Sequence, residues 1–393
     1  MPRTLIDRSV LFLVLIIILI VASLFLLLSS LKVDPVEQAV QDELMINLAL
    51  ILERDGKPIA TELLMYYPGN ARGALLDIPV ETGLIIQSLN RVDRIDALYD
   101  PQSPKTFLAE ISKLTDTAIE WYLVLDEAGL RDTVDLLEGL PVFIPNSVRS
   151  IQDGKPLFLP SGAVMLDGQK MLSYIRHVDE DRPEAETVAR RQAVFTALVK
   201  RMGERKDFVF RDEVFKSFAR RFRSNLSIES LSHLFGQLAK LDSDRIVLQR
   251  LTGTPRTVEG IPLLFPHYDG ELVRDIVKQT LNALLNAEAI AVSDKVFTIE
   301  ILNGTTERGL AQRTAEIFQG FGYEVVSVGN APSTDIALSR VIDRYGDPAA
   351  ASTLANVIRC TVIESATATP STGASADFII ILGKNFNGRY CVD

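Results

Sequence analysis

Polar side chains follow a proline at the end of a short apolar run. Residues 76–83 read LDIPVETG, so that Val80, Glu81 and Thr82 come directly after Pro79. A strand that ends at a proline-marked turn is a common way to present the next side chains to a ligand. Glu81 is the only one of the three that can ionise, and it is therefore a candidate acid.

Arginines gather on both sides of an acidic loop that separates two helical segments. Arg176 lies near the end of the segment MLSYIRHV, and Arg190 and Arg191 lie in ETVARRQ after the loop. A guanidinium group binds carboxylates and phosphates by the same paired hydrogen bonds. Three alternatives stay open: anion binding, catalysis, or plain salt bridges to Asp179, Glu180, Asp181, Glu184 or Glu186.

Other kinds of chemistry find little support in the sequence. His177, His233 and His267 do not have the spacing of metal ligands, and neither a glycine-rich phosphate loop nor a Ser-His-Asp signature is present. A net charge of −10 argues against a nucleic-acid partner, because the phosphate backbone attracts clustered Lys and Arg.

A long apolar run near the amino terminus predicts a membrane anchor. Residues 9–31 contain no charged side chain, and a helix of that length spans about 35 Å, more than the hydrocarbon core of a bilayer. Arg3 and Arg8 precede the run, and four acids against one lysine follow it. The positive-inside bias places residues 1–8 in the cytoplasm and everything after Lys32 on the outer side of the cell (inner) membrane.

The two cysteines, Cys360 and Cys391, leave a disulfide open. A bond between them would restrict a loop of about 30 residues and stabilise the fold by about 3 to 4 kcal/mol in the chain-entropy model. Two unpaired thiols are the alternative, because sequence spacing does not fix the distance between two Cα atoms.

Strand-like and helix-like segments alternate along the chain after the apolar run. LMINLALIL and ELLMYY flank an Asp-Gly turn, and ALLDIP, IEWYLVLD and VFIP read as further strands. We expect an α/β/α layered domain with a central sheet over residues 32–292. Residues 293–393 repeat the alternation, and we expect them to fold as a second, small α/β domain; residues 365–376 read as a flexible loop.

Two stretches resemble known families. VFTIEILNGTTERGLAQRTAEIFQGFGYEVVSVGNA, with the later RVIDRYGDPAAASTLANVI and DFIIILG, resembles the LytR C-terminal domain. The larger domain is similar to the LytR-CpsA-Psr family through RIDALYD, IEWYLVLDEAGLRDTVDLLEGLPV and LDGQKMLSYIR followed by RRQ. The resemblance implies membrane-anchored phosphotransferases that move glycopolymers from polyprenyl pyrophosphate to peptidoglycan or related acceptors. Arginines, an acidic group and Mg²⁺ then hold the pyrophosphate, and a hydrophobic pocket holds the polyprenyl tail.

The strand motifs of that family are altered in this chain. Where the family has Arg-x-Asp-Thr, the chain has IATELL, so that Thr61 stands for the aspartate unless Glu62 replaces it after a slip of one residue. Where the family has Ser-Ile-Pro-Arg-Asp-Thr, Val80 stands for the arginine and Glu81 for the aspartate.

The helical motifs are altered as well. Arg176, Arg191 and Gln192 match the family, and Arg190 lies one position from the usual site, so the resemblance makes these four residues the candidate phosphate-binding groups. Val178 and Val188 stand where further arginines are expected. Because positioned cations supply most of the stabilisation in phosphoryl transfer, we expect a binding or scaffolding protein with weakened catalysis and no assigned catalytic residue. An active phosphotransferase that uses Mg²⁺ and Glu62 or Glu81 is the alternative, and the sequence identifies no metal ligands.

The topology gives the first prediction. Protease added to intact spheroplasts should digest residues 33–393, because the charge-free run and its basic flank place them outside the membrane. Immunoblots with antibodies to each end of the chain would follow the digestion. Protection of residues 33–393 until the membrane is broken would contradict the orientation.

Overall fold

The computed structural model describes residues 12–13, 15–21, 23, 33–152, 155–178, 183–286, 297–321, 323–365 and 376–392. The expected membrane anchor, residues 9–31, lies largely outside these ranges, as do most of the expected flexible loop and the boundary between residues 292 and 293. Within the described ranges, no helix is both long enough and apolar enough to cross a bilayer.

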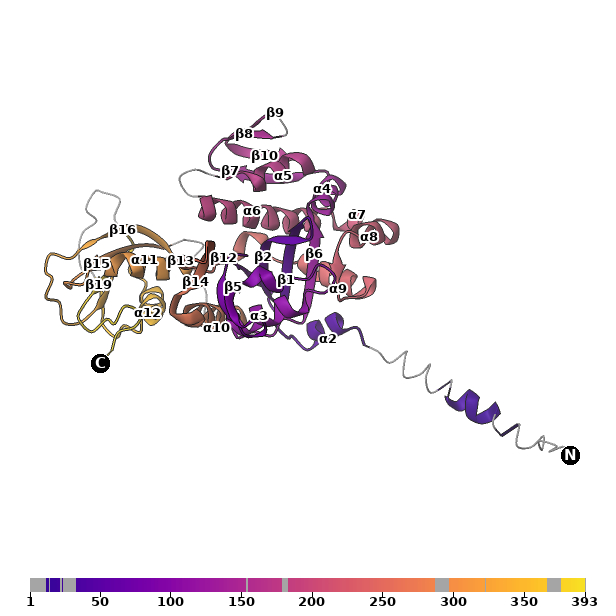
Figure 1. Ribbon diagram of the computed structural model, residues 1–393, viewed down its shortest axis with the longest axis horizontal. Helices are drawn as coiled ribbons and strands as arrows, with labels where there is room; N and C mark the ends of the chain where they lie inside the picture. Colours follow the sequence, from indigo (N-terminus) through magenta and orange to yellow (C-terminus); the bar gives the residue numbers. More distant parts are fainter. Residues whose placement is uncertain are drawn as a thin grey trace.

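A six-stranded mixed sheet forms the centre of the larger domain (Figure 1). Its strand order is β11-β6-β1-β2-β3-β12. Strand β1 pairs with β2 in antiparallel and with β6 in parallel fashion, and β12 adds in parallel to β3. The strands are Ile46–Arg54 (β1), Lys57–Tyr67 (β2), Arg72–Asp77 (β3), Trp121–Asp126 (β6), Arg223–Ser224 (β11) and Val247–Arg250 (β12).

The hairpin between β1 and β2 follows directly from its turn residues. Asp55 and Gly56 both have positive φ, 52° and 72°, as the expected Asp-Gly turn requires. The turn pairs Arg54 with Lys57, and an irregularity between Leu52 and Glu53 then shifts the register by one residue, which places Ile51 opposite Thr61. Successive residues of each strand face opposite sides of the sheet.

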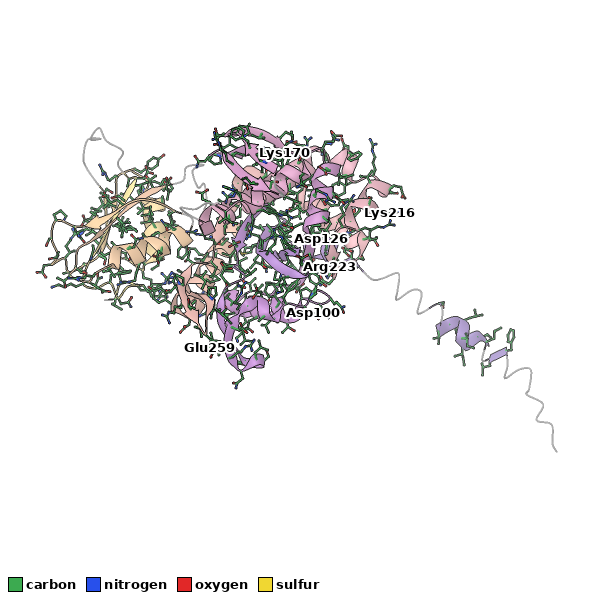
Figure 2. The ribbon with its side chains drawn as sticks, turned by 45° about the horizontal axis from the view of Figure 1, so that its top comes forward. Asp100, Asp126, Lys170, Lys216, Arg223 and Glu259 are labelled. Carbon is green, nitrogen blue, oxygen red and sulfur yellow. The ribbon has the colours of Figure 1, made fainter. Side chains whose placement is uncertain are left out.

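Helices cover both faces of this sheet, as the expected three-layer arrangement requires. On one face, Leu48, Leu64 and Leu75 pack with helices on the side of α6; on the other, Leu63, Met65 and Leu76 pack with α3 and α10. Asp126, at the end of β6, caps α4 by accepting a hydrogen bond from the Gly129 amide at 2.6 Å (Figure 2). The helices are Pro35–Gln41 (α2), Lys105–Thr115 (α3), Glu127–Leu136 (α4), Gly168–Arg176 (α5), Pro183–Glu204 (α6), Lys206–Val209 (α7), Asp212–Ala219 (α8), Ile228–Leu238 (α9) and Glu271–Leu285 (α10).

Four two-stranded ribbons surround the central sheet. The sequence predicts a loop at the stretch PSGAVMLDGQK, but part of it is strand β10, which pairs with β7. No local signal in the sequence marks this strand, because its hydrogen-bond partners lie in β7, earlier in the chain. The ribbons are Gly83–Ile86 with Arg91–Arg94 (β4, β5), Leu140–Ile144 with Gly162–Leu166 (β7, β10), Val148–Gln152 with Lys155–Leu159 (β8, β9), and Gly253–Val258 with Ile261–Pro266 (β13, β14).

The carboxy-terminal part forms a second, five-stranded sheet with the order β16-β15-β19-β17-β18. Strands β15 and β16 are parallel and flank helix α11 in sequence, as the strand-helix-strand pattern predicts. The segment RVID is strand β17, which agrees with the expectation from the resemblance. The elements are Thr298–Asn303 (β15), Leu310–Gly320 (α11), Glu324–Asn330 (β16), Arg340–Asp343 (β17), Pro348–Val357 (α12), Ile363–Ser365 (β18) and Phe378–Leu382 (β19).

Helix α10 belongs to both hydrophobic cores. Leu272 and Ile276 pack with the carboxy-terminal sheet, whereas Val273 and Val277 pack beneath the central sheet. At the same contact, Asp275 accepts hydrogen bonds from Arg389 at 2.7 Å and from the Tyr390 hydroxyl. The core of the second domain therefore includes side chains from before residue 293.

The disulfide that the sequence left open is not formed, since Cys360 and Cys391 are free thiols. The two thiols hydrogen-bond to each other, which lowers the pKa of Cys360 to about 7. The Cys360 thiol also donates to the Ser339 carbonyl oxygen at 3.2 Å. The structure thus brings the two cysteines together without the covalent bond.

The double role of α10 predicts where two neighbouring substitutions act. Ile276→Ala should destabilise the carboxy-terminal domain and Val277→Ala the larger domain, each by about 1 to 5 kcal/mol, because each leaves a cavity in a different core. Hydrogen exchange read by mass spectrometry would locate the loss of protection. Lys278→Ala, at an exposed position of the same helix, is the control, and an identical exchange pattern for both variants would contradict the assignment.

Candidate functional site

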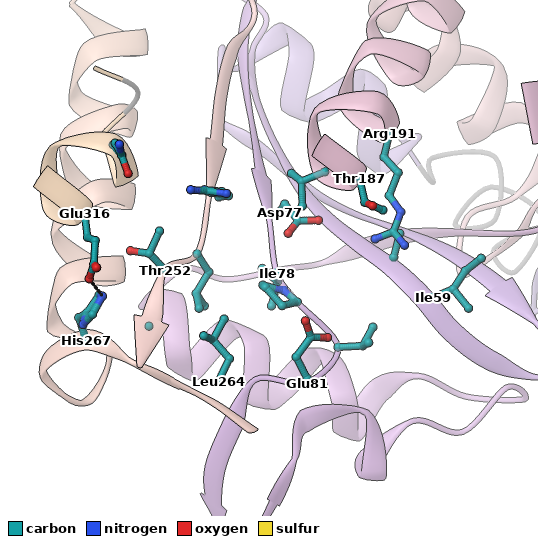
Figure 3. Close-up of a pocket in the computed structure, with 18 of the residues that line it drawn as sticks. Ile59, Asp77, Ile78, Glu81, Thr187, Arg191, Thr252, Leu264, His267 and Glu316 are labelled. Atoms are coloured by element: carbon teal, nitrogen blue, oxygen red, sulfur yellow. Dashed lines mark ion pairs between the residues drawn. The ribbon is translucent and has the colours of Figure 1, made fainter. Parts of the chain in front are cut away.

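A cavity of about 550 Å³ lies where the central sheet, α6 and the carboxy-terminal domain meet (Figure 3). Its volume is in the range typical of small-molecule sites. The turn after β3, the start of α6, the end of β12 and one face of α11 all contribute to its lining. Apolar side chains form part of the wall: Ile59, Ala60, Ile78, Pro79, Val80, Val178, Val188, Leu251 and Leu264.

The turn LDIPVETG lies at the cavity, but only some of its side chains reach it. Val80 and Glu81 line the cavity. Thr82 is fully buried and closes the turn instead, since its hydroxyl donates to the Pro79 carbonyl oxygen at 2.6 Å. The Leu264 amide donates to the Glu81 carbonyl oxygen at 2.9 Å, so that strand β14 holds the turn in place.

Two buried carboxyl groups face each other across β2 and β3. Glu62 and Asp77 are register partners with exposures of 7% and 2%, and Asp77 also lines the cavity. Glu62 lies on the face of the sheet that carries Leu64 and packs toward α6, whereas Thr61 points to the opposite face. The geometry therefore places Glu62, not Thr61, beside the site. This corresponds to the alternative in which the family motif is shifted by one residue, so that Glu62 takes the place of the aspartate.

Burial raises the pKa of both carboxyl groups. Loss of hydration is the largest cause for each, and the negative charge of Asp77 adds to it for Glu62. Arg191 opposes the shift at both groups. Because burial raises both pKa values and two adjacent buried carboxylates repel each other, the pair retains a proton near neutral pH. The buried Glu62 Oε1 atom has no hydrogen-bond partner among the described residues.

Gln192 supports the acid pair from α6. The side chain is 5% exposed, and its amide nitrogen donates to Glu62 Oε2 at 3.4 Å and to the Gln249 carbonyl oxygen at 2.8 Å. The side-chain amide of Gln192 therefore hydrogen-bonds to residues of the central sheet. Gln192 is a positioning residue in this structure, although the sequence suggested a phosphate contact.

Two guanidinium groups line the cavity, those of Arg191 and Arg250. Arg191 is one of the arginines that the sequence singled out. Arg250 was missed, because the segment VLQR was not recognised as strand β12, which pairs with β3 and places Arg250 opposite Asp77. Asp77 was also missed, and its only sequence signal is a charged residue at the end of the apolar run ALLD.

The other two candidate arginines do not line the cavity. Arg176 donates to both carboxylate oxygens of Glu127, at 2.9 Å and 2.5 Å, and Arg54 binds the same carboxylate from β1. Although burial opposes ionisation, the two arginines lower the pKa of Glu127 to about 2. Arg190 is buried and donates to the His177 carbonyl oxygen at 2.6 Å. Both arginines have structural partners, and the partner of Arg176 lies outside the acidic loop.

All three valines that replace expected arginines line the cavity. They come from separate parts of the chain: Val80 from the turn after β3, Val178 from the segment after α5, and Val188 from α6. Three valine side chains from separate parts of the chain therefore line the same cavity.

A further wall comes from the carboxy-terminal domain and was not foreseen. Gln312, Glu316 and Gln319 of α11 line the cavity together with His267. The His267 Nε2 atom lies 3.6 Å from a Glu316 carboxylate oxygen, as the dashed line in Figure 3 shows. Burial lowers the pKa of His267, so that the imidazole is neutral near pH 7.

Comparison with protein families identifies the class of protein. Residues 62–279 match the LytR_cpsA_psr family, and residues 297–386 match a domain described as LytR cell envelope-related transcriptional attenuator. The first match covers more than half of the chain. The chain therefore belongs to the LytR_cpsA_psr family and carries a LytR C-terminal domain.

Individual relatives are distant. The polyisoprenyl-teichoic acid–peptidoglycan teichoic acid transferase TagV of Bacillus subtilis (strain 168) is 20% identical over 167 residues, which are 41% of this chain and 43% of that protein. This chain thus matches less than half of the length of that curated relative.

Solved structures share the fold. B. subtilis TagV has a TM-score of 0.53 at 18% identity over 61% of this chain and 98% of that one. An Enterococcus faecalis protein described as a transcriptional regulator has a TM-score of 0.53 at 15% identity, and the match covers 64% of this chain and 91% of that one. TagT bound to LIIa-WTA has a TM-score of 0.51 at 18% identity, and the match covers 61% of this chain and 91% of that one. At these identities the likeness shows the fold alone.

The buried acid pair predicts a pH dependence of stability. The stabilising effect of a raised carboxyl pKa is complete below the ordinary value of about 4 and disappears as the pH rises through the raised value, which for Asp77 is about 7. In the wild type, the unfolding free energy should therefore decrease as the pH rises from about 4 to about 7. Glu62→Gln should make this decrease smaller, by at most about 1.4 kcal/mol for each unit of pKa shift that the substitution removes.

Denaturant titrations at several pH values would measure this difference. Glu213→Gln is the matched control, because the Glu213 side chain is 88% exposed. If both variants follow the wild-type curve in parallel, Glu62 and Asp77 do not share a proton.

Proposed function

We propose that this chain is a membrane-anchored, extracytoplasmic cell-envelope protein whose cavity holds the phosphate group of a polyprenyl-linked glycan or glycopolymer. In this proposal the protein binds its ligand and transfers it poorly or not at all. The membership of the LytR_cpsA_psr family and the similarity to a teichoic acid transferase support the class of ligand. The apolar run of residues 9–31 supports the anchor.

The convergence of Val80, Val178 and Val188 on the cavity is the observation that carries the proposal. A transferring phosphoryl group is stabilised mainly by positioned cations, and the loss of one such donor costs about 3 to 4 kcal/mol by analogy with oxyanion sites. Binding needs fewer aligned donors than catalysis. Arg191 and Arg250, beside the apolar wall, can hold a phosphate with a hydrophobic substituent.

The residues at the cavity fit Mg²⁺ poorly. Thr61 replaces one expected aspartate and faces the other side of the sheet, and Glu62 does not line the cavity. A magnesium ion binds through ionised carboxylates and phosphate oxygens. In the part of the chain that the structure describes, no group of three or more His, Cys, Asp or Glu side chains has the arrangement of a metal site. Binding of the phosphate is therefore assigned to the arginines alone.

An active glycopolymer phosphotransferase is the second candidate. It is favoured by one specific observation, that the carboxyl groups of Asp77 and Glu81 line the same cavity as the guanidinium groups of Arg191 and Arg250. Such a transferase would move a glycosyl phosphate to an acceptor hydroxyl and release polyprenyl phosphate. The two candidates differ in turnover, not in ligand.

A binding and turnover experiment tests the proposal. The purified full chain, with Mg²⁺, a polyprenyl pyrophosphate-linked glycan and a peptidoglycan acceptor, should bind the lipid-linked glycan without releasing polyprenyl phosphate. Arg191→Ala should weaken binding at least about tenfold, because a hydrogen bond to a charged group contributes about 1.5 to 3 kcal/mol. Turnover at the rate of an active family member, abolished by Arg191→Ala or Glu81→Gln, would establish the transferase instead.

Val178→Arg provides a complementary variant, since Val178 is 60% exposed and tolerates a longer side chain. The added guanidinium group should tighten binding by about tenfold. Val247→Arg, at an exposed position that does not line the cavity, is the matched control. Equal affinities for the wild type and Val178→Arg would contradict a phosphate group at this end of the cavity.

A further inference from the structure

The wall that α11 contributes differs in chemistry from the rest of the cavity. Gln312, Glu316 and Gln319 are spaced by four and three residues, so that they share one helix face, and all three line the cavity. The two glutamine side chains are exposed, and in the described part of the structure neither makes a hydrogen bond within the protein. Their donors and acceptors are therefore available to a ligand.

Two other polar groups lie at the same end. The Thr252 hydroxyl lines the cavity, and its buried oxygen has no hydrogen-bond partner among the described residues. His267 is 17% exposed at its side chain and lies beside Glu316. A buried hydroxyl without a partner costs about 1 to 3 kcal/mol, and a ligand hydroxyl would remove that cost.

The two ends of the cavity thus differ in charge. In Figure 3, Arg191 and Thr187 lie on one side and His267 and Glu316 on the other, with Asp77 and Glu81 between them. The end formed by α11 presents amides, a hydroxyl, a neutral imidazole and one carboxylate. A second phosphate would meet the charge of Glu316 there, and an alkyl chain would leave the amides unsatisfied. Neutral hydroxyl groups match this set of donors and acceptors.

We propose that the α11 wall is a sugar subsite, in which Gln312, Gln319 and Thr252 hydrogen-bond to hydroxyl groups of a glycosyl residue whose phosphate lies at Arg191. This inference rests on the proposed function, because it requires a phosphate at the other end. The LytR C-terminal domain then contributes directly to ligand recognition, by completing a cavity that the larger domain leaves open.

Two small probes separate the sugar contribution from the phosphate contribution. Glucose 1-phosphate and methyl phosphate carry the same phosphate charge, and only the first carries a ring with hydroxyl groups. Ligand-observed NMR on the full chain would give both dissociation constants. The wild type should bind glucose 1-phosphate about tenfold more tightly, a ratio that one or two net hydrogen bonds produce.

The Gln312→Ala/Gln319→Ala variant should reduce that ratio to near one and leave methyl phosphate binding unchanged. Gln41→Ala, an exposed helical glutamine on α2, is the matched control and should keep the wild-type ratio. Arg191→Ala should weaken the binding of both probes.

Each remaining outcome counts against a specific statement. If the wild type binds both probes equally, or if the double variant keeps the preference, the sugar subsite is wrong while phosphate binding stands. If neither probe binds the wild type, the proposed function is wrong and the sugar subsite with it.

Discussion

The position of helix α10 between two hydrophobic cores is the constraint on which the site depends. Leu272 and Ile276 are buried against the carboxy-terminal sheet, and Val273 and Val277 against the larger domain. A helix fixed on both sides cannot shift without opening one core, because packed interiors tolerate little change in volume. The His267–Glu316 contact and the Asp275 hydrogen bonds lie on the same junction. The distance between α11 and the central sheet, and with it the shape of the cavity, follows from this packing.

Charge balance at the cavity determines what kind of ligand it can hold. Arg191 and Arg250 are offset in part by Glu81 and by a carboxyl pair that retains a proton. If Glu62 and Asp77 were both ionised, the two guanidinium groups would be neutralised and little attraction for a phosphate would remain. The shared proton therefore leaves the arginines available to an anion.

The sequence predicts the local parts of this structure well and the non-local parts poorly. The Asp55-Gly56 turn and the alternating strands are local signals, and the structure has both. Val80, Val178 and Val188, which the motifs singled out, line one cavity. Strand β12 has four residues and no alternation that distinguishes it, so that Arg250 and its pairing with Asp77 were missed. The α11 wall could not be foreseen, because it depends on how two domains pack and not on any motif.

The pleat of β2 explains why the acid of this strand was ambiguous in the sequence and is not in the structure. Neighbouring residues of a strand face opposite sides, so that a shift of one position moves a carboxyl group from one layer to the other. Thr61 faces the layer of α3 and α10, and Glu62 faces Gln192 of α6. An aspartate at position 61 would lie in an apolar core without a cation, whereas Glu62 reaches Asp77 and the field of Arg191. Glu62 has a longer side chain than the expected aspartate and lies one residue later in the strand. It is 7% exposed and lies under α6, and it is not part of the cavity lining. An acid in that position contacts Asp77 and Gln192 and affects the charge of Asp77, but it does not line the cavity.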